Sequence, residues 1–144
     1  MTALPDDFAE ERAAATERER GTWRERLRAR YPTWTSGLVR GFEVGDGWRE
    51  VAEDFCRSLD DRLGGEATCP DFRLTQVKQK FGLIRIYFEN ANSKSLPVVE
   101  QVIRCAEDRS RTACEVCREP GSLIERRRYL RVACPAHEHV SFSL

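Results

Sequence analysis

The sequence predicts an α+β fold in which helices pack on one face of an antiparallel β-hairpin. Two observations predict this class. Apolar residues recur at spacings of three and four in residues 48–63 and 98–106, which is the period of a helix with one buried face. Between these segments, two runs rich in β-branched and aromatic residues flank a turn that contains glycine, a pattern typical of a hairpin.

Residues 1–40 are expected to form a charged N-terminal helix followed by a linker. An aspartate pair near the start can cap a helix that extends to about Arg30. The apolar stripe of this helix is thin at first, and proline and glycine after it break the pattern. We expect only its last part to dock on the core, through Trp23, Leu27 and Tyr31.

Residues 41–112 are expected to form the α+β core, which opens with a helix over residues 48–63. Asp46 is placed to cap this helix, and Gly64-Gly65 to end it. Trp48 follows a glycine-rich turn and is expected to be a core anchor. After Trp48, the predicted buried stripe of this helix consists of Val51, Phe55, Leu59 and Leu63.

The hairpin and a third helix complete the predicted core. The strands Phe72–Lys78 and Leu83–Phe88 are joined through residues 79–82. A helix then starts near Ser95 and Pro97, and its apolar stripe consists of Val98, Val99, Val102, Ile103 and Ala106. We expect both helices to cover the face of the hairpin that carries Ile84, Ile86 and Phe88. Two strands alone are marginal, so the sheet can gain strands from a neighbour.

Composition restricts the compartment and the partners. The 144 residues include 24 basic and 24 acidic side chains, a formal net charge of +0, which argues against a protein that binds nucleic acid or membranes through bulk charge. No apolar run approaches the length of about 20 residues that a membrane span needs. The mixture of Glu, Arg and Ala over residues 1–25 is unlike a secretory signal, so we expect a cytoplasmic protein.

Four of the five cysteine and histidine residues in 113–144 predict a metal site. Cys114 and Cys117 have two residues between them, and so do Cys134 and His137. Zinc favours a tetrahedral set of thiolate and imidazole ligands, and this spacing lets one turn present two of them. The sequence therefore predicts one zinc ion in a module spanning residues 113–144. His139 is the alternative fourth ligand.

The segment between the two ligand pairs has the form of a second, smaller hairpin. Pro120-Gly121 is a turn, and the strands are expected at 122–125 and 129–133. A turn with two cysteine ligands, followed by a hairpin and a closing helical turn, resembles a treble-clef zinc finger. Because four protein ligands leave no open coordination position, the zinc is expected to be structural, and a chelator should unfold this module.

The other cysteines do not form ligand pairs. Cys56 and Cys105 lie on or beside helical apolar stripes and are expected to be small core residues. Cys69, between Thr68 and Pro70, is a candidate reactive thiol. It lacks a histidine base, because both histidines belong to the zinc segment, so nucleophilic catalysis is not expected.

Three stretches resemble a family of small bacterial and phage-associated zinc-knuckle proteins. They are Gly45-Asp46-Gly47-Trp48, the run from Gln76 to Gly82 with Arg85 and Tyr87, and Cys114–Cys117 with Pro120-Gly121. The resemblance implies the treble-clef-like fold and the metal. An association of such proteins with mobile elements implies a toxin-neutralising immunity role or another defence-related role.

Two groups of side chains are candidate partner-binding surfaces. The hairpin brings Gln76, Lys78, Arg85 and Tyr87 onto one sheet face, with Lys80 near the turn. This face is either a recognition surface for an acidic group or an ordinary solvent face. Arg126, Arg127 and Arg128 form a basic loop beside the zinc site, which either grips nucleic-acid backbone or is simply solvated.

Three functions follow from these features. The first is a non-enzymatic, zinc-stabilised module that binds and modulates a protein partner, such as a toxin or effector. The alternative is a nucleic-acid-binding regulator that uses the zinc-module hairpin and the basic strand face. The third, a nuclease of the treble-clef class, would need a histidine between the ligand pairs, and the sequence has none there.

Overall fold

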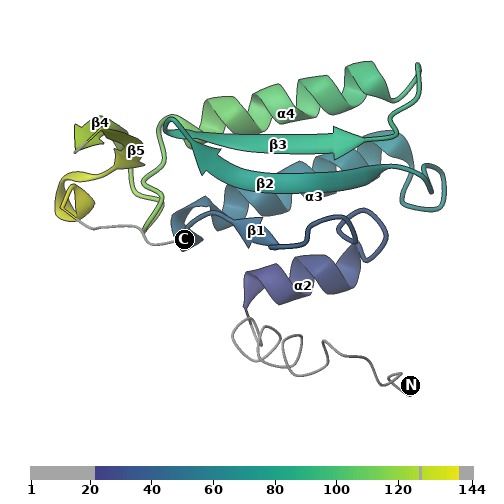
Figure 1. Cartoon of the computed structure of the whole chain (residues 1–144), viewed down its shortest axis with the longest axis horizontal. Coiled ribbons are helices and arrows are strands. Elements are labelled where there is room, and N and C mark those ends of the chain that lie inside the picture. Colours follow the sequence, from purple (N-terminus) through teal and green to yellow (C-terminus); the bar gives the residue numbers. More distant parts are fainter. Residues whose placement is uncertain (1–21, 127, 140–144) are drawn as a thin grey trace.

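The computed structural model describes residues 22–126 and 128–139 (Figure 1). Of the predicted N-terminal helix, these residues include the end, α2 (Trp23–Arg30), and the earlier part lies outside the described residues. The hydroxyl of Thr22 caps α2 by accepting a hydrogen bond of 3.3 Å from the amide of Glu25. Trp23 and Leu27 are buried, so this last part of the helix docks on the core as predicted.

The larger sheet has three strands in the order β1-β2-β3. The predicted hairpin is confirmed as β2 (Arg73–Lys80) and β3 (Leu83–Glu89), which pair antiparallel. Its turn is shorter than the predicted residues 79–82: only Phe81 and Gly82 connect the strands, and both have positive φ angles, 56° and 77°. This pair of angles matches the twist of the strands that it joins.

The extra strand comes from the same chain. Phe42 and Glu43 form β1, which pairs parallel with Val77 and Lys78 of β2. The expected source of a further strand was a neighbour, and the sequence does not reveal this one because two residues are too few to show a period.

A β-bulge interrupts β2. Leu74 pairs with Phe88 and Gln76 pairs with Tyr87, so Thr75 is an extra residue with no counterpart on β3. Because of this extra residue, Leu74 and Val77, which are three positions apart, are both buried.

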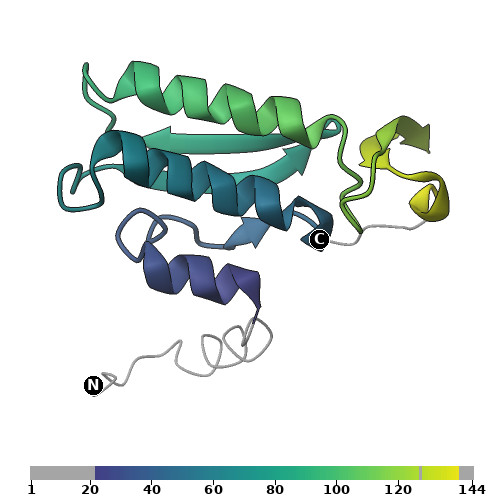
Figure 2. The same ribbon diagram turned by 180° about the vertical axis from the view of Figure 1, so that it is seen from behind.

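Helices α3 (Arg49–Leu63) and α4 (Leu96–Ser110) lie side by side on one face of the sheet, as predicted (Figure 2). In the described part of the chain, no helix covers the opposite face of β2 and β3, which faces the viewer in Figure 1. Gly64 ends α3 in the left-handed conformation, which confirms its expected role.

The prediction that Asp46 caps the second helix was wrong. A short 3-10 turn, η1 (Asp46–Trp48), precedes α3, and the residue before η1 is Gly45. The Asp46 carboxylate instead accepts hydrogen bonds from the Trp23 indole nitrogen at 3.0 Å and from Arg24 at 2.8 Å. Asp46 therefore ties α2 to the core.

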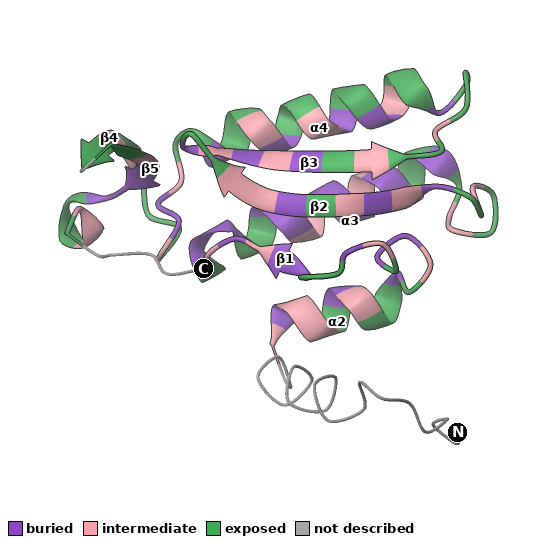
Figure 3. Ribbon diagram, viewed as in Figure 1, coloured by how far each residue is buried: buried purple, intermediate pink, exposed green. Residues whose placement is uncertain are grey.

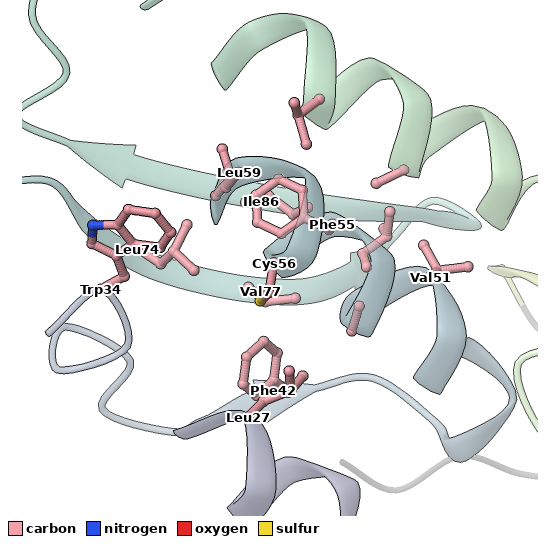
Figure 4. Packing of buried hydrophobic residues seen from close by; sticks show 14 of the residues in the cluster. Leu27, Trp34, Phe42, Val51, Phe55, Cys56, Leu59, Leu74, Val77 and Ile86 are labelled. Atoms are coloured by element: carbon pink, nitrogen blue, oxygen red, sulfur yellow. The ribbon is translucent and has the colours of Figure 1, made fainter. Parts of the chain in front are cut away.

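One continuous core lies between the helices and the sheet (Figures 3 and 4). Trp48 is 0% exposed and is the predicted anchor. Phe55, Leu59 and Val99 meet Ile84 and Ile86 in this cluster, while Phe88 and Ile103 pack against it half-buried. The irregular segment after α2 adds two buried side chains that the sequence analysis did not identify, Trp34 and Leu38.

The cysteines outside the carboxyl-terminal segment differ in their environment. Cys56 is buried, as expected, and burial raises the pKa of its thiol to about 12. Cys69 is half-buried. The expectation for Cys105 was wrong: it is exposed, because Val102 and Ala106 occupy the buried stripe of α4 and Cys105 points away from it.

The remaining described residues, 113–126 and 128–139, form a smaller unit that we call the C-terminal module. Its two strands, β4 (Ser122–Arg126) and β5 (Tyr129–Ala133), agree with the predicted hairpin. A single 3-10 turn, η2 (Pro135–His137), follows. None of the helices in the described part of the chain is both long and apolar enough to cross a membrane.

Candidate metal centre

The C-terminal module brings four potential metal ligands together. The sulfur atoms of Cys114, Cys117 and Cys134 and a ring nitrogen of His137 all lie within 4.8 Å of one another. The first two come from the turn before β4, and the other two come from the end of β5 and from η2. These are the four residues that the spacing of the sequence predicts.

The distances within this cluster are close to those around a single ion, and only the contact of His137 with Cys134 is shorter. Cys117 Sγ lies 3.6 Å from Cys134 Sγ, and His137 Nδ1 lies 3.7 Å from Cys114 Sγ and 3.2 Å from Cys134 Sγ. A tetrahedral metal with bonds of about 2.3 Å to sulfur and about 2.0 Å to nitrogen places its ligand atoms roughly 3.5–3.8 Å apart. The four residues can therefore hold one metal ion.

The backbone of the Cys114–Cys117 turn is closed by hydrogen bonds. The amide of Arg118 donates to the carbonyl of Cys114 at 2.8 Å, and the amide of Cys114 donates to the carbonyl of Glu119 at 2.8 Å. Arg118 has a positive φ angle of 76°, which lets the chain reverse after the second cysteine. The turn thus presents both sulfurs to the same point.

The pKa of the Cys114 thiol is lower than that of an ordinary cysteine, so this thiol ionises more readily. Its burial favours the neutral form, but backbone amides of Cys134, Cys117 and Val116 oppose this and lower its pKa to about 6. For Cys117, the amide of Glu119 lowers the pKa, while desolvation and the sulfurs of Cys134 and Cys114 raise it to about 11. A divalent cation among the sulfurs would favour the thiolate form of both.

Glu115, between the first two ligands, fixes the C-terminal module to the core. It is 0% exposed, and its carboxylate accepts a hydrogen bond of 3.0 Å from the amide of Gly45. Burial raises its pKa to about 7, an effect that the Gly45 amide and Arg131 partly oppose. Its carbonyl accepts a second hydrogen bond, 2.8 Å long, from the amide of Gly47.

The two glycines of the Gly45-Asp46-Gly47-Trp48 motif are required by this contact. A Cβ atom on Gly45 would lie 2.4 Å from the Glu115 carbonyl oxygen, and one on Gly47 would lie 2.0 Å from that of Cys114. The Trp48 indole nitrogen completes the attachment with a hydrogen bond of 2.8 Å to the carbonyl of Ala113. The motif therefore docks the metal-ligating turn, a role that the sequence analysis did not find. The feature of the sequence that could have indicated this contact is Glu115, the glutamate between the two cysteine ligands.

Arg131 links β5 to the last ligand. This buried side chain donates through Nη2 to the carbonyl of Glu138 at 2.5 Å and contacts that of His137 at 3.5 Å. It thereby holds η2 against the hairpin and orients His137.

His139 does not belong to the cluster. Its ring nitrogen Nδ1 contacts the Arg126 guanidinium, and the sequence-based alternative for the fourth ligand therefore has another partner. Arg128 is exposed at the hairpin tip with a φ angle of 69°. Arg127, the middle residue of the candidate basic loop, lies outside the described residues.

The second candidate surface is the open face of β2 and β3. Gln76 pairs with Tyr87, and Lys78 pairs with Arg85, so these four side chains share the face without helices. Lys78 Nζ lies 5.6 Å from the Tyr87 ring centre, within cation–π range. Glu43 of β1 is the register partner of Lys78, and Lys80 stands beside the exposed ring of Phe81.

Arg85 connects this face to the helix layer. Its guanidinium forms an ion pair of 2.9 Å with Glu107 of α4.

Comparison of the chain with known protein families, with curated proteins and with solved structures gave no match.

Proposed function

We propose that this protein is a zinc-stabilised binding module without catalytic activity, which recognises a protein partner through the open face of β2 and β3. Three thiolates and one imidazole are the donor set that zinc prefers. The four protein ligands leave no coordination position for a substrate, so the role of the ion is structural. The treble-clef assignment is part of this proposal.

The observation that carries the protein-binding proposal is the combination of cations and aromatic rings on the open sheet face. Lys78, Lys80 and Arg85 lie beside Tyr87 and Phe81, which are 40% and 64% exposed. Interface centres are enriched in aromatic residues and arginine. The cations favour a partner with an acidic surface, and the family resemblance makes a toxin or effector the specific form of this proposal.

Affinity capture from the native host tests this function. The zinc-loaded wild type is compared with the variant Lys78→Glu/Tyr87→Ala and with Arg104→Glu, a control that changes charge on the exposed side of α4. After nuclease treatment, we expect one acidic protein to be retained by the wild type and the control and lost by the double variant. Equal recovery by all three proteins would contradict the proposal.

A second candidate is binding of single-stranded nucleic acid, which the contact of Lys78 with Tyr87 favours. Open sheets that combine exposed rings with lysine and arginine stack bases and neutralise phosphates. Glu43 and Glu107 next to the cations weaken this candidate. Binding of an oligonucleotide that weakens steeply with salt, and is lost in the Lys78→Glu/Tyr87→Ala variant, would support it.

A further inference from the structure

The outer edge of β3 offers backbone hydrogen-bonding groups. β2 pairs with one edge of β3, and the described residues supply no strand to the other. The amide of Ile84 donates to the Ser110 hydroxyl of α4 at 3.1 Å, so Ile84 directs its backbone groups away from β2. Because this direction alternates along an antiparallel strand, Ile86 and Phe88 direct their N–H and C=O groups to the same outer edge.

A groove runs along this edge, between β3 and α4. It has a volume of about 240 Å³ and is lined by Phe81, Arg85, Ile86, Tyr87, Ile103 and Glu107 among others. Figures 1 and 2 show α4 lying beyond the outer edge of β3, whereas α3 lies behind the sheet. The helix layer therefore extends further than the strands beneath it.

We propose that an extended, acidic segment of the protein partner adds to the β3 edge as a fourth strand. This inference rests on the protein-binding function proposed above and specifies how the partner is held. The backbone of the segment would bond to Ile86 and Phe88, as in other cases of strand addition. Alternate side chains would then point toward Ile103 of α4 or lie beside Arg85 and Tyr87 on the open face.

The charged side chains that line the groove determine which residues the added segment should carry. Arg85 forms an ion pair of 2.9 Å with Glu107, and both side chains line the groove together with Lys80. A carboxylate on the outer side of the added strand would meet Lys80 and would compete with Glu107 for Arg85. The side chains on its inner side would meet Ile103 and Ile86, so the favoured sequence alternates acidic and apolar residues.

A second copy of this chain is the other possible occupant of the edge. Pairing two β3 edges would bring two α4 helices to the same place, because each helix already extends beyond its own strand (Figure 2). The geometry therefore favours a peptide segment over a dimer.

Amide hydrogen exchange of the full, zinc-loaded chain tests the proposal. The probe is a peptide of about eight residues, a typical strand length, that alternates valine and glutamate. We expect exchange at Ile86 and Phe88 to slow when the peptide is added. A peptide of alternating valine and lysine should give no protection. Absence of protection at about 1 mM peptide would overturn the proposal, as would protection of the same amides by self-association without peptide.

Variants separate this inference from the proposed function. Ile103→Arg places a long side chain in the groove, and Gln101→Arg is the control on the exposed side of the same helix. Circular dichroism establishes that both are folded. We expect Ile103→Arg to weaken peptide binding and partner capture at least about tenfold, and Gln101→Arg to change neither. Partner capture that survives Ile103→Arg but is lost in Lys78→Glu/Tyr87→Ala would overturn strand addition while supporting the proposed function.

Discussion

The amide nitrogen of Gly47 lies 2.8 Å from the carbonyl oxygen of Glu115 and donates a hydrogen bond to it. This bond joins η1, the short turn before α3, to the turn that carries the first two metal ligands. The C-terminal module and the core therefore share a buried contact, and their stabilities are expected to be linked.

Substitution of Gly47 by alanine tests this contact. The added Cβ would lie 2.0 Å from the carbonyl oxygen of Cys114, which is backbone and cannot move aside cheaply. We expect Gly47→Ala to lower the free energy of unfolding by about 2–3 kcal/mol in urea denaturation. Arg49→Ala, an exposed neighbour, should change it by less than about 0.5 kcal/mol. Equal stability of the two variants would show that the contact is not tight.

Removal of one metal ligand should destabilise the whole C-terminal module. We expect elemental analysis to find one metal ion per chain in the wild type and none in Cys114→Ser, because Cys114 is one of the four clustered ligands. Without the ion the small hairpin lacks most of its folding free energy, so the melting temperature should fall by roughly 5–10 °C. Cys105→Ser, which changes an exposed cysteine outside the cluster, is the matched control. An unchanged metal content in Cys114→Ser would contradict the four-ligand site.

Asp46 should make stability depend on pH at the acidic end. The Trp23 hydrogen bond and then the Arg24 ion pair outweigh burial and hold the pKa of its carboxyl below the ordinary value of 3.8. Asp46 thus contributes stability above about pH 4, and this contribution disappears as the pH falls through the lowered pKa.

The Asp46→Asn variant measures this contribution. At pH 7 it should be less stable than the wild type by about 0.5 kcal/mol, a small value because the side chain is 72% exposed and solvent screens the charges. The difference should vanish in urea titrations near pH 2–3. A difference that stays constant over this range would show that the Asp46 charge is not involved.

Phe81 at the hairpin turn is expected to lower the free energy of unfolding, because its backbone has a positive φ angle. It is 64% exposed and has a φ angle of 56°, a conformation that asparagine and glycine adopt more readily. We expect Phe81→Asn to raise the free energy of unfolding by about 0.5–1 kcal/mol. Phe81→Ala, which removes the ring but not the strain, should show no such gain. If both variants lose stability equally, the ring contributes packing that its exposure does not suggest.

Local patterns in the sequence were sufficient to predict most of the helices and strands. The stripe of Val51, Phe55 and Leu59 predicted α3 because a buried helical face needs that period, and Val99 and Val102 did the same for α4. The metal cluster was equally predictable, because two ligand pairs with two-residue gaps constrain the backbone whatever surrounds them.

The elements that could not be predicted depend on contacts distant in sequence. Phe42 and Glu43 form a strand only because β2 lies beside them. Trp34 and Leu38 are buried in an irregular segment that shows no period. The burial of Glu115 follows from the approach of Gly45 and Gly47, about seventy residues earlier in the chain, and composition alone assigns a glutamate to the surface.

Thr75 is an insertion that β2 can lose without a change in which of its side chains are buried. Leu74 and Val77 are three positions apart and point to the same side because Thr75 is an extra residue between them. Deletion of this single codon would leave them two positions apart and still on the same side, so the strand would become regular while its pairs with β3 stayed the same. Thr75 should accept replacement and also loss, so natural variants of this protein are expected to differ there both by exchange and by deletion.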